Sequence, residues 1–307
     1  MLLSGNSLDL LMVGSSDSVR PRSDATLIKA VVNGTAVTCP VEGYDRRHCF
    51  SCGHVAGAYI DGRPVVCTGF DASSCHASST ASKSWEPYGQ LDISRKYAAA
   101  VDIGKRGWLI TGGYDLDRGT LATSAILKDG VSESGPRLPR KVSGHCMTGV
   151  NATHVFMAGG MDTRSGAHAN AYLLNVDTMK WTSLPDMRVK RWDLGCARIS
   201  EDEIIVVGGY EGTGYSYRDE MERSEVFSLT SMAWRDGPKD PEVKFTAKWH
   251  AFPHEGTVVL VDSKRDSKWV WLLNKEAERF EKFSEIGLQD GIPIALPAGH
   301  GIVCRDE

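Results

Sequence analysis

The sequence lacks the features that would place it within a membrane or on nucleic acid. No apolar run approaches the roughly 18 residues that a membrane-spanning helix needs, and the longest runs, such as Val258 to Val261, have the length of a strand. The formal net charge of the 307 residues is −4, too small to indicate nucleic acid or a membrane surface as the partner. The first residues, MLLSGNSLDLLMVGSS, lack the basic segment and long apolar core of a signal peptide, which leaves open a cytosolic chain or one numbered after processing.

The common catalytic motifs are also missing. The chain has no GxSxG elbow, no HExxH motif, no Walker loop and no GxGxxG loop. Acid pairs such as Asp115 with Asp117 lie in predicted turns, where solvated carboxylates are expected. No segment has a convincing amphipathic helical period, and 274–283 is predicted to be a hairpin. We therefore expect an all-β chain that needs no cofactor or metal.

Glycine is abundant, with 32 residues that fall mostly in short clusters at the ends of predicted strands. An apolar run that ends in a glycine doublet or its remnant recurs as PVVCTGF (64–70), WLITGGY (108–114), VFMAGGM (155–161) and IIVVGGY (204–210). The last glycines, Gly69, Gly113, Gly160 and Gly209, are separated by 44, 47 and 49 residues. A third apolar segment and a tryptophan follow several of these runs, at Trp85, Trp181 and Trp234. On an outer strand, each indole would fill the space beside a neighbouring sheet.

These residues resemble the kelch repeat family. The resemblance implies a single six-bladed β-propeller over residues 1–307, with five contiguous blades near 47–94, 95–139, 140–187, 188–237 and 238–287. The sixth blade is expected to join 288–307 to 1–46, with LPAGHGIVC (296–304) beside LDLLMVGS, ATLIKAVVN and TAVTCPV, because this closure hides the edge strands. The chain departs from the pattern at Val261-Asp262, which replaces a glycine doublet, and at 95–139, which lacks the outer tryptophan.

Eight cysteines are present, and five of them lie between Cys39 and Cys75. Cys67 ends a predicted strand and Cys75 starts the next, and adjacent antiparallel strands approach closely enough for a disulfide. The arrangement resembles that of extracellular kelch proteins of invertebrates. We expect a Cys67–Cys75 disulfide, with two buried thiols as the alternative. Cys146 and Cys196, in matching places of neighbouring units, are expected to be core thiols.

The pair Cys49-x-x-Cys52, flanked by His48 and His54, could suggest zinc. A structural zinc site usually needs two such knuckles, so a disulfide from Cys39 to Cys49 or Cys52 is the favoured interpretation.

Two N-glycosylation sequons begin at Asn33 and Asn151, both in predicted turns. Together with the cysteines they favour a secreted, extracellular protein, and a cytoplasmic location stays open.

Basic residues recur where each unit begins: Arg46-Arg47, Arg95-Lys96, Arg140-Lys141, Lys190-Arg191 and Lys248. In a propeller these positions would surround the mouth of the central channel and focus a positive potential. In kelch domains that resemble this chain, arginines at such positions bind acidic peptides. The candidate partner-binding residues are therefore Arg47, Arg95, Arg140 and Arg191, with His145, Trp192, Trp249 and His250 as neighbours. Solvated turn charges without a ligand are the alternative.

Long loops are expected after the second strand of several units. The longest, 211–223, carries Tyr215 and Tyr217, and tyrosine with glycine is typical of recognition loops.

The sequence thus predicts a monomeric scaffold that binds a protein or an acidic peptide and carries out no covalent chemistry. A sugar mutarotase on the same fold is one alternative, which would use His145 or His250 as an acid–base group. A fragment of an intracellular ubiquitin-ligase substrate adaptor is another, although the helical dimerisation domain of such proteins is missing.

Overall fold

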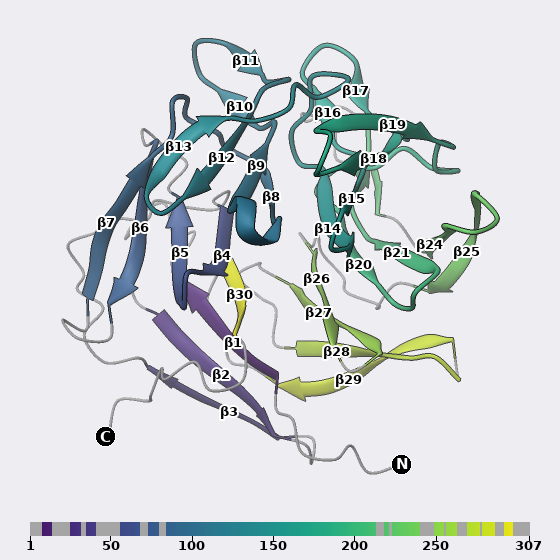
Figure 1. Ribbon diagram of the computed structural model, residues 1–307. Coiled ribbons are helices and arrows are strands. Elements are labelled where there is room, and N and C mark those ends of the chain that lie inside the picture. Colours follow the sequence, from purple (N-terminus) through teal and green to yellow (C-terminus); the bar gives the residue numbers. More distant parts are fainter. Residues whose placement is uncertain are drawn as a thin grey trace.

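The computed structural model describes an all-β arrangement of small antiparallel sheets (Figure 1). The described residues are 8–13, 25–31, 35–40, 56–67, 73–79, 84–212, 218–220, 223–239, 249–254, 256–262, 269–276, 278–285 and 292–296. Their one helix is a 3-10 turn, η1 (Gly104–Arg106). In this part of the chain, no helix is long and apolar enough to cross a membrane.

Three separate four-stranded sheets follow one another along the chain. The first contains β4 (Ala56–Ile60), β5 (Arg63–Cys67), β6 (Ser74–Ser79) and β7 (Ser84–Gln90), in that order. The second has the order β8 (Ala99–Asp102), β9 (Trp108–Thr111), β12 (Ser124–Lys128) and β13 (Val131–Ser134). The third has the order β14 (Cys146–Asn151), β15 (His154–Ala158), β18 (Ala171–Asn175) and β19 (Lys180–Leu184).

The next eight strands form one larger sheet. Its first half has the order β20 (Gly195–Arg198), β21 (Glu203–Val207), β24 (Arg223–Ser228) and β25 (Ala233–Lys239), and its second half contains β26 (Trp249–His254), β27 (Thr257–Asp262), β28 (Trp269–Asn274) and β29 (Arg279–Glu285). A single parallel pair, Lys239 with Arg279, joins β25 to β29. The edge strands β20 and β26 contact each other, so this barrel-like sheet is nearly closed. The hairpin predicted at 274–283 is confirmed as the turn between β28 and β29.

The two ends of the chain meet in one sheet, as expected. Its order is β3 (Thr35–Pro40), β2 (Ala25–Val31), β1 (Leu8–Val13) and β30 (Ile292–Leu296). The described C-terminal strand of this sheet is IPIAL, and the strand predicted at 296–304 lies outside the described residues beyond Leu296. Ile294 and Leu296 point to the same side of β30 and both are buried.

The first strands of successive sheets contact one another. The pairs in contact are β30 with β4, β4 with β8, β8 with β14, β14 with β20, and β20 with β26. Beyond the glycine doublets, the regions expected as loops form short hairpins instead, two of them at the top of Figure 1. The hairpins are β10 (Tyr114–Asp115) with β11 (Gly119–Thr120), β16 (Met161–Asp162) with β17 (Gly166–Ala167), and β22 (Tyr210–Glu211) with β23 (Arg218–Glu220).

The first glycine of each doublet is required because the next sheet packs directly on it. Gly112, Gly159 and Gly208 all have positive φ, of 58°, 67° and 64°. A Cβ on Gly112 would lie 3.0 Å from His145 Cε1, and one on Gly159 would lie 2.9 Å from Leu194 Cδ1. A Cβ on Gly208 would overlap the Trp249 indole. The glycine repeat therefore reflects close contact between neighbouring sheets.

Gly208→Ala is expected to lower the free energy of unfolding by about 2–5 kcal/mol, because left-handed backbone strain adds to the overlap with Trp249. Gly62→Ala is the matched control, since Gly62 has a φ of 78° but no atom within 4 Å of the position that a Cβ would take. Gly62→Ala should lower the free energy of unfolding only by the strain of the left-handed backbone, about 1–2 kcal/mol. Equal losses in urea unfolding would contradict the close packing at Gly208.

The outer-strand tryptophans pack between sheets, as predicted. Trp234 on β25 lies 6.2 Å, between ring centroids, from Phe156 of the preceding sheet, and its Nε1–H donates to the carbonyl of Pro185 at 2.8 Å. Trp181 packs against a core cluster that includes Leu109 of the sheet before it. These two indoles therefore contribute apolar contacts between neighbouring sheets.

Two disulfides are present in the described residues. The predicted Cys67–Cys75 bridge is confirmed, between directly paired residues of β5 and β6. The prediction that Cys146 and Cys196 are free thiols is wrong, because they form a second disulfide with a Cα–Cα distance of 5.7 Å. In the register of β14 with β15, Cys146 lies opposite Ala158, one residue before the Gly159-Gly160 doublet. In the register of β20 with β21, Cys196 lies opposite Val206, two residues before the Gly208-Gly209 doublet. This one-residue offset turns the two side chains toward each other across neighbouring sheets.

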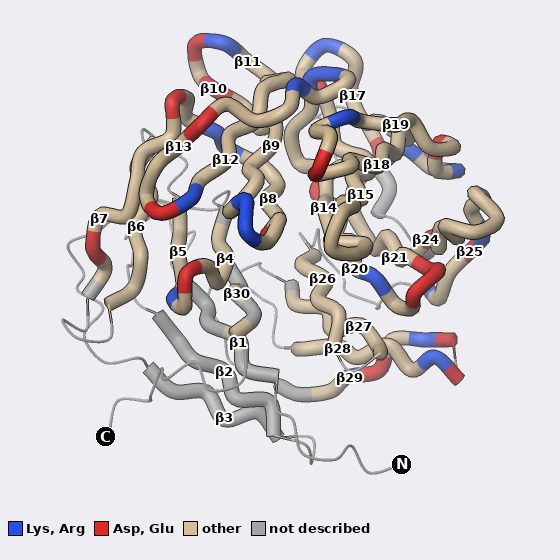
Figure 2. The backbone as a smooth tube through the Cα atoms, viewed as in Figure 1, with Lys and Arg blue, Asp and Glu red and all other residues tan. Residues whose placement is uncertain are grey.

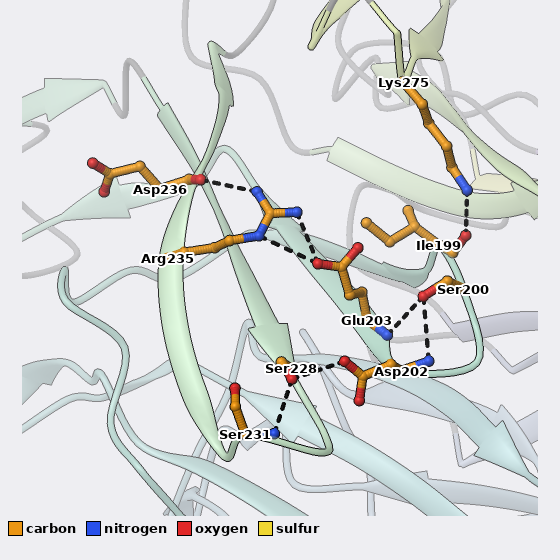
Figure 3. A network of polar contacts seen from close by, with 9 residues as sticks. All are labelled: Ile199, Ser200, Asp202, Glu203, Ser228, Ser231, Arg235, Asp236 and Lys275. Carbon is orange, nitrogen blue, oxygen red and sulfur yellow. Dashed lines mark hydrogen bonds and ion pairs between the residues drawn. The ribbon is translucent and has the colours of Figure 1, made fainter.

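At the end of the sheets away from the short hairpins, polar side chains tie the turns together (Figure 3). Asp202 accepts a hydrogen bond from the Ser228 hydroxyl at 2.8 Å and one from the Thr230 N–H at 2.6 Å. Hydrogen bonding by Thr230, and then by Ser228, holds the pKa of Asp202 below its usual value. Lys275, after β28, donates to the Ile199 carbonyl at 2.6 Å and so links the two halves of the eight-stranded sheet.

Candidate functional site

Two of the predicted partner-binding arginines lie in the interior. Arg95 is 4% exposed and Arg191 is 1% exposed. Arg95 Nη1 donates to the carbonyls of Gly112 and Thr123, at 3.0 and 2.8 Å, and its Nη2 donates to the Thr123 hydroxyl. Burial lowers the pKa of Arg95, and the nearby Asp92 partly opposes this effect. The prediction that these guanidinium groups are available to a partner is therefore corrected.

Arg191 has the same role in a later sheet. Its Nη1 donates to the Gly208 carbonyl at 3.1 Å, and its Nη2 donates to Glu225 Oε1 at 2.9 Å. The other hydrogen bonds to the Glu225 carboxylate come from the backbone N–H groups of Arg188 and Val189. The arginines recur because the left-handed glycine turn needs a donor for its carbonyl, and a long side chain reaches it from the same sheet.

His145 is also a packing residue. Its Nε2 lies 2.7 Å from the Thr111 hydroxyl, and its ring covers Gly112. Burial lowers the pKa of His145 to about 3, so the imidazole is neutral at pH 7. Without the imidazolium form, the ring lacks the acidic proton that a general acid donates, which removes support for His145 in that role.

The remaining predicted neighbours are placed as follows. Trp192 is buried beneath the hairpins, 5.3 Å from the Tyr210 ring. Trp249 is buried and packs against Gly208, and the half-buried His250 lines a central cavity. Arg47, Tyr215 and Tyr217 lie outside the described residues, as do Asn33, Cys49 and Cys52, while Cys39 is described only as backbone in β3.

The central cavity has a volume of about 170 Å³ and is lined by the first strands β4, β8, β14, β20 and β26. The residues that line it include polar ones, among them Tyr97, Asp193 and His250, and the aromatic residues Trp249 and Phe252. Neither lysine nor arginine lines it among the described residues. The cavity is therefore separate from the basic side chains of the surface.

A chain of backbone hydrogen bonds surrounds part of this cavity. Gly144 N–H donates to the Tyr97 carbonyl at 2.8 Å, and Asp193 N–H donates to the Gly144 carbonyl at 2.7 Å. All three residues have positive φ, of 57°, 60° and 56°, at the same position of successive sheets. Tyr97 and Asp193 carry no signal of this role in the sequence, since a tyrosine or aspartate with a left-handed backbone has no characteristic sequence pattern.

The short hairpins form a continuous surface, which we call the hairpin face. It comprises the residues of β10–β11, β16–β17 and β22–β23 together with Arg140, Lys141 and Lys190. The Thr163 N–H donates to the Thr120 hydroxyl at 3.3 Å, which joins the first hairpin to the second. The Ala167 N–H donates to the Gly212 carbonyl at 3.1 Å, which joins the second to the third.

The hairpin face carries exposed basic side chains at its tips, where Figure 2 shows Lys and Arg in blue. Arg118 and Arg164 are exposed at the tips of the first two hairpins. The acids beside them, Asp115 and Asp162, instead accept hydrogen bonds from backbone N–H groups of those turns. Acidic residues share this face with the basic ones: Asp117 and Glu211 are exposed, and β23 contains Asp219 and Glu220 beside Arg218.

The pKa of His168 reflects the positive charge at the base of the hairpins. Burial, with the positive charges of Arg140 and Lys190, lowers the pKa of His168 to about 4, and Asp162 opposes this shift. Arg140 is half-buried and donates to Asn170. Of the four predicted arginines, Arg140 is thus the one described at this surface.

The two disulfides indicate an oxidising compartment, such as the extracellular space. No protein-family model matches the sequence, and no curated protein matches it either.

Proposed function

We propose that this chain is a six-bladed kelch-type propeller, and that its hairpin face binds an acidic segment of a partner protein. The propeller is supported by sheets whose strands are ordered as they occur in sequence, by the contacts between their first strands, and by the joined termini. In this interpretation the eight-stranded sheet is two neighbouring blades that touch at Lys239 and Arg279.

The observation that carries the binding proposal is the hairpin face itself. Its hairpins are fixed to one another by hydrogen bonds, and it presents Arg118, Arg164, Lys141 and Lys190 to solvent. Fixed hairpins lose little conformational entropy on binding, and the basic side chains would attract an acidic peptide. The disulfides support a secreted protein that acts outside the cell.

A fluorescent oligo-glutamate peptide provides the test. We expect it to bind the full chain more weakly as salt is raised, because exposed charges are screened. Arg118→Glu with Arg164→Glu should weaken this binding about tenfold, which corresponds to about 1.4 kcal/mol.

Lys105→Glu with Lys128→Glu is the control, because it makes the same change of charge at exposed residues near the other end of the sheets. Equal weakening by both pairs would show that net charge alone attracts the peptide, and would refute a site on the hairpin face. Unchanged binding in the Arg118 and Arg164 variant would refute it too.

A further inference from the structure

The turn between β14 and β15 holds the asparagine of a sequon in a defined geometry. Asn151 is the last residue of β14 and is exposed. Its Oδ1 accepts hydrogen bonds from the Thr153 N–H at 2.9 Å and from the Thr153 hydroxyl at 3.0 Å. The third residue of the sequon therefore contacts the asparagine through both its backbone and its side chain.

Neighbouring side chains fix this arrangement further. Asn175 Nδ2 lies 3.3 Å from His154 Nε2, and His154 Nδ1 lies 2.9 Å from the Thr153 hydroxyl. All three contacts can be hydrogen bonds at once if each group donates to the next. Asn175 Nδ2 then donates to His154 Nε2, His154 Nδ1 donates to the Thr153 hydroxyl, and this hydroxyl donates to Asn151 Oδ1. Asn151 Nδ2 then makes no hydrogen bond to a described residue.

We propose that Asn151 is modified with an N-linked oligosaccharide. In the transfer, a bond forms between Asn151 Nδ2 and the anomeric carbon of a lipid-linked oligosaccharide diphosphate. The bond from that carbon to the diphosphate oxygen breaks, the lipid diphosphate leaves, and the amide loses one proton to a base of the transferring enzyme. Hydrogen bonds to Oδ1 favour the loss of this proton, since they stabilise the imidate anion, whose negative charge lies largely on the amide oxygen. The disulfides are consistent with the oxidising compartment in which such transfer occurs.

The position of Asn151 makes the modification compatible with binding at the hairpin face. β14 begins beside the β16–β17 hairpin, where Ser143 is bridged to Met161, and ends at Asn151. A glycan on Asn151 would thus project from the opposite end of the sheet. The inference does not depend on the proposed function, because the modification requires no partner.

Asn175 provides an internal comparison. Its Oδ1 also accepts backbone N–H groups, from Asp177 and Thr178 at 3.0 and 2.9 Å. Its Nδ2, however, is directed to His154, and Asp177 occupies the position that a sequon gives to serine or threonine. Asn175 should remain unmodified.

The test is to secrete the full chain, behind a cleavable leader, from a eukaryotic cell line that performs N-glycosylation. All variants carry Asn33→Gln, so that the other sequon does not contribute. Peptide mapping by mass spectrometry should find a glycan on Asn151, and enzymatic release of the glycan should convert Asn151 to aspartate. Thr153→Ala and Asn151→Gln should abolish the glycan, whereas Thr153→Ser and Asn175→Gln should retain it. Secreted protein that contains the Cys146–Cys196 disulfide but has unmodified Asn151 would overturn the proposal.

Discussion

Replacing Cys146 and Cys196 together by alanine is expected to lower the free energy of unfolding by about 4 kcal/mol. The disulfide closes a loop of 50 residues and joins two different sheets at their first strands. Without it, the unfolded chain gains the conformational entropy that the bridge had removed. Urea unfolding under non-oxidising, non-reducing conditions measures the loss, with an increase in the m-value as the unfolded state expands.

Cys67→Ala with Cys75→Ala is the matched control. Both cysteines are buried, but their bridge spans only 8 residues within one sheet. Its removal should cost about 2.5 kcal/mol, because a shorter loop restrains the unfolded chain less. A larger loss from this pair than from Cys146 and Cys196 would contradict the assignment of the long-range bridge.

Arg191→Met is expected to destabilise the protein by about 3–5 kcal/mol, since it leaves the Glu225 carboxylate buried without its cation. The two side chains are only 1% and 4% exposed, and Arg191 also supplies the donor for the Gly208 carbonyl. A melting-temperature shift together with urea unfolding measures this loss. Adding Glu225→Gln should recover part of the stability, because it removes the uncompensated buried charge and its amide oxygen can still accept one of the two backbone N–H groups, of Arg188 or of Val189.

Arg235→Met removes the cation from the exposed pair of Arg235 with Glu203 and serves as the comparison. Solvent screens that pair, so its loss should cost at most about 1 kcal/mol. If Arg191→Met were equally mild while binding of the acidic peptide was lost, Arg191 would have to be a partner-binding residue, as the sequence alone suggested.

The repeated glycines and tryptophans predicted the strands around them, because local alternation and the glycine at a left-handed turn are properties of the sequence itself. The terminal sheet was expected from the closure that the kelch resemblance implies, and the Cys67–Cys75 bridge from the adjacency of two predicted strands. The sequence also identified the arginines at 95 and 191 as a repeated feature. It could not show that these side chains point inward. Their hydrogen-bond acceptors are the backbone carbonyls of Gly112 and Gly208, and every residue has such a carbonyl, so the sequence does not mark these two as acceptors.

The Cys146–Cys196 bridge was missed for a related reason. Whether two cysteines on neighbouring strands face each other depends on a single-residue offset in register, and the offset is visible only relative to the glycine doublets. The hairpin face was missed in part, since its hairpins were expected to be loops. Its continuity depends on hydrogen bonds such as that from Ala167 to Gly212, which join segments 45 residues apart.

Hydrogen–deuterium exchange with saturating oligo-glutamate peptide tests the central claim most directly, because it maps the bound surface without changing the protein. We expect slower exchange at the hairpins of 114–120 and 161–167, and unchanged exchange at the opposite turns of 102–108 and 151–154. Slower exchange at the opposite turns, with none at the hairpins, would contradict it.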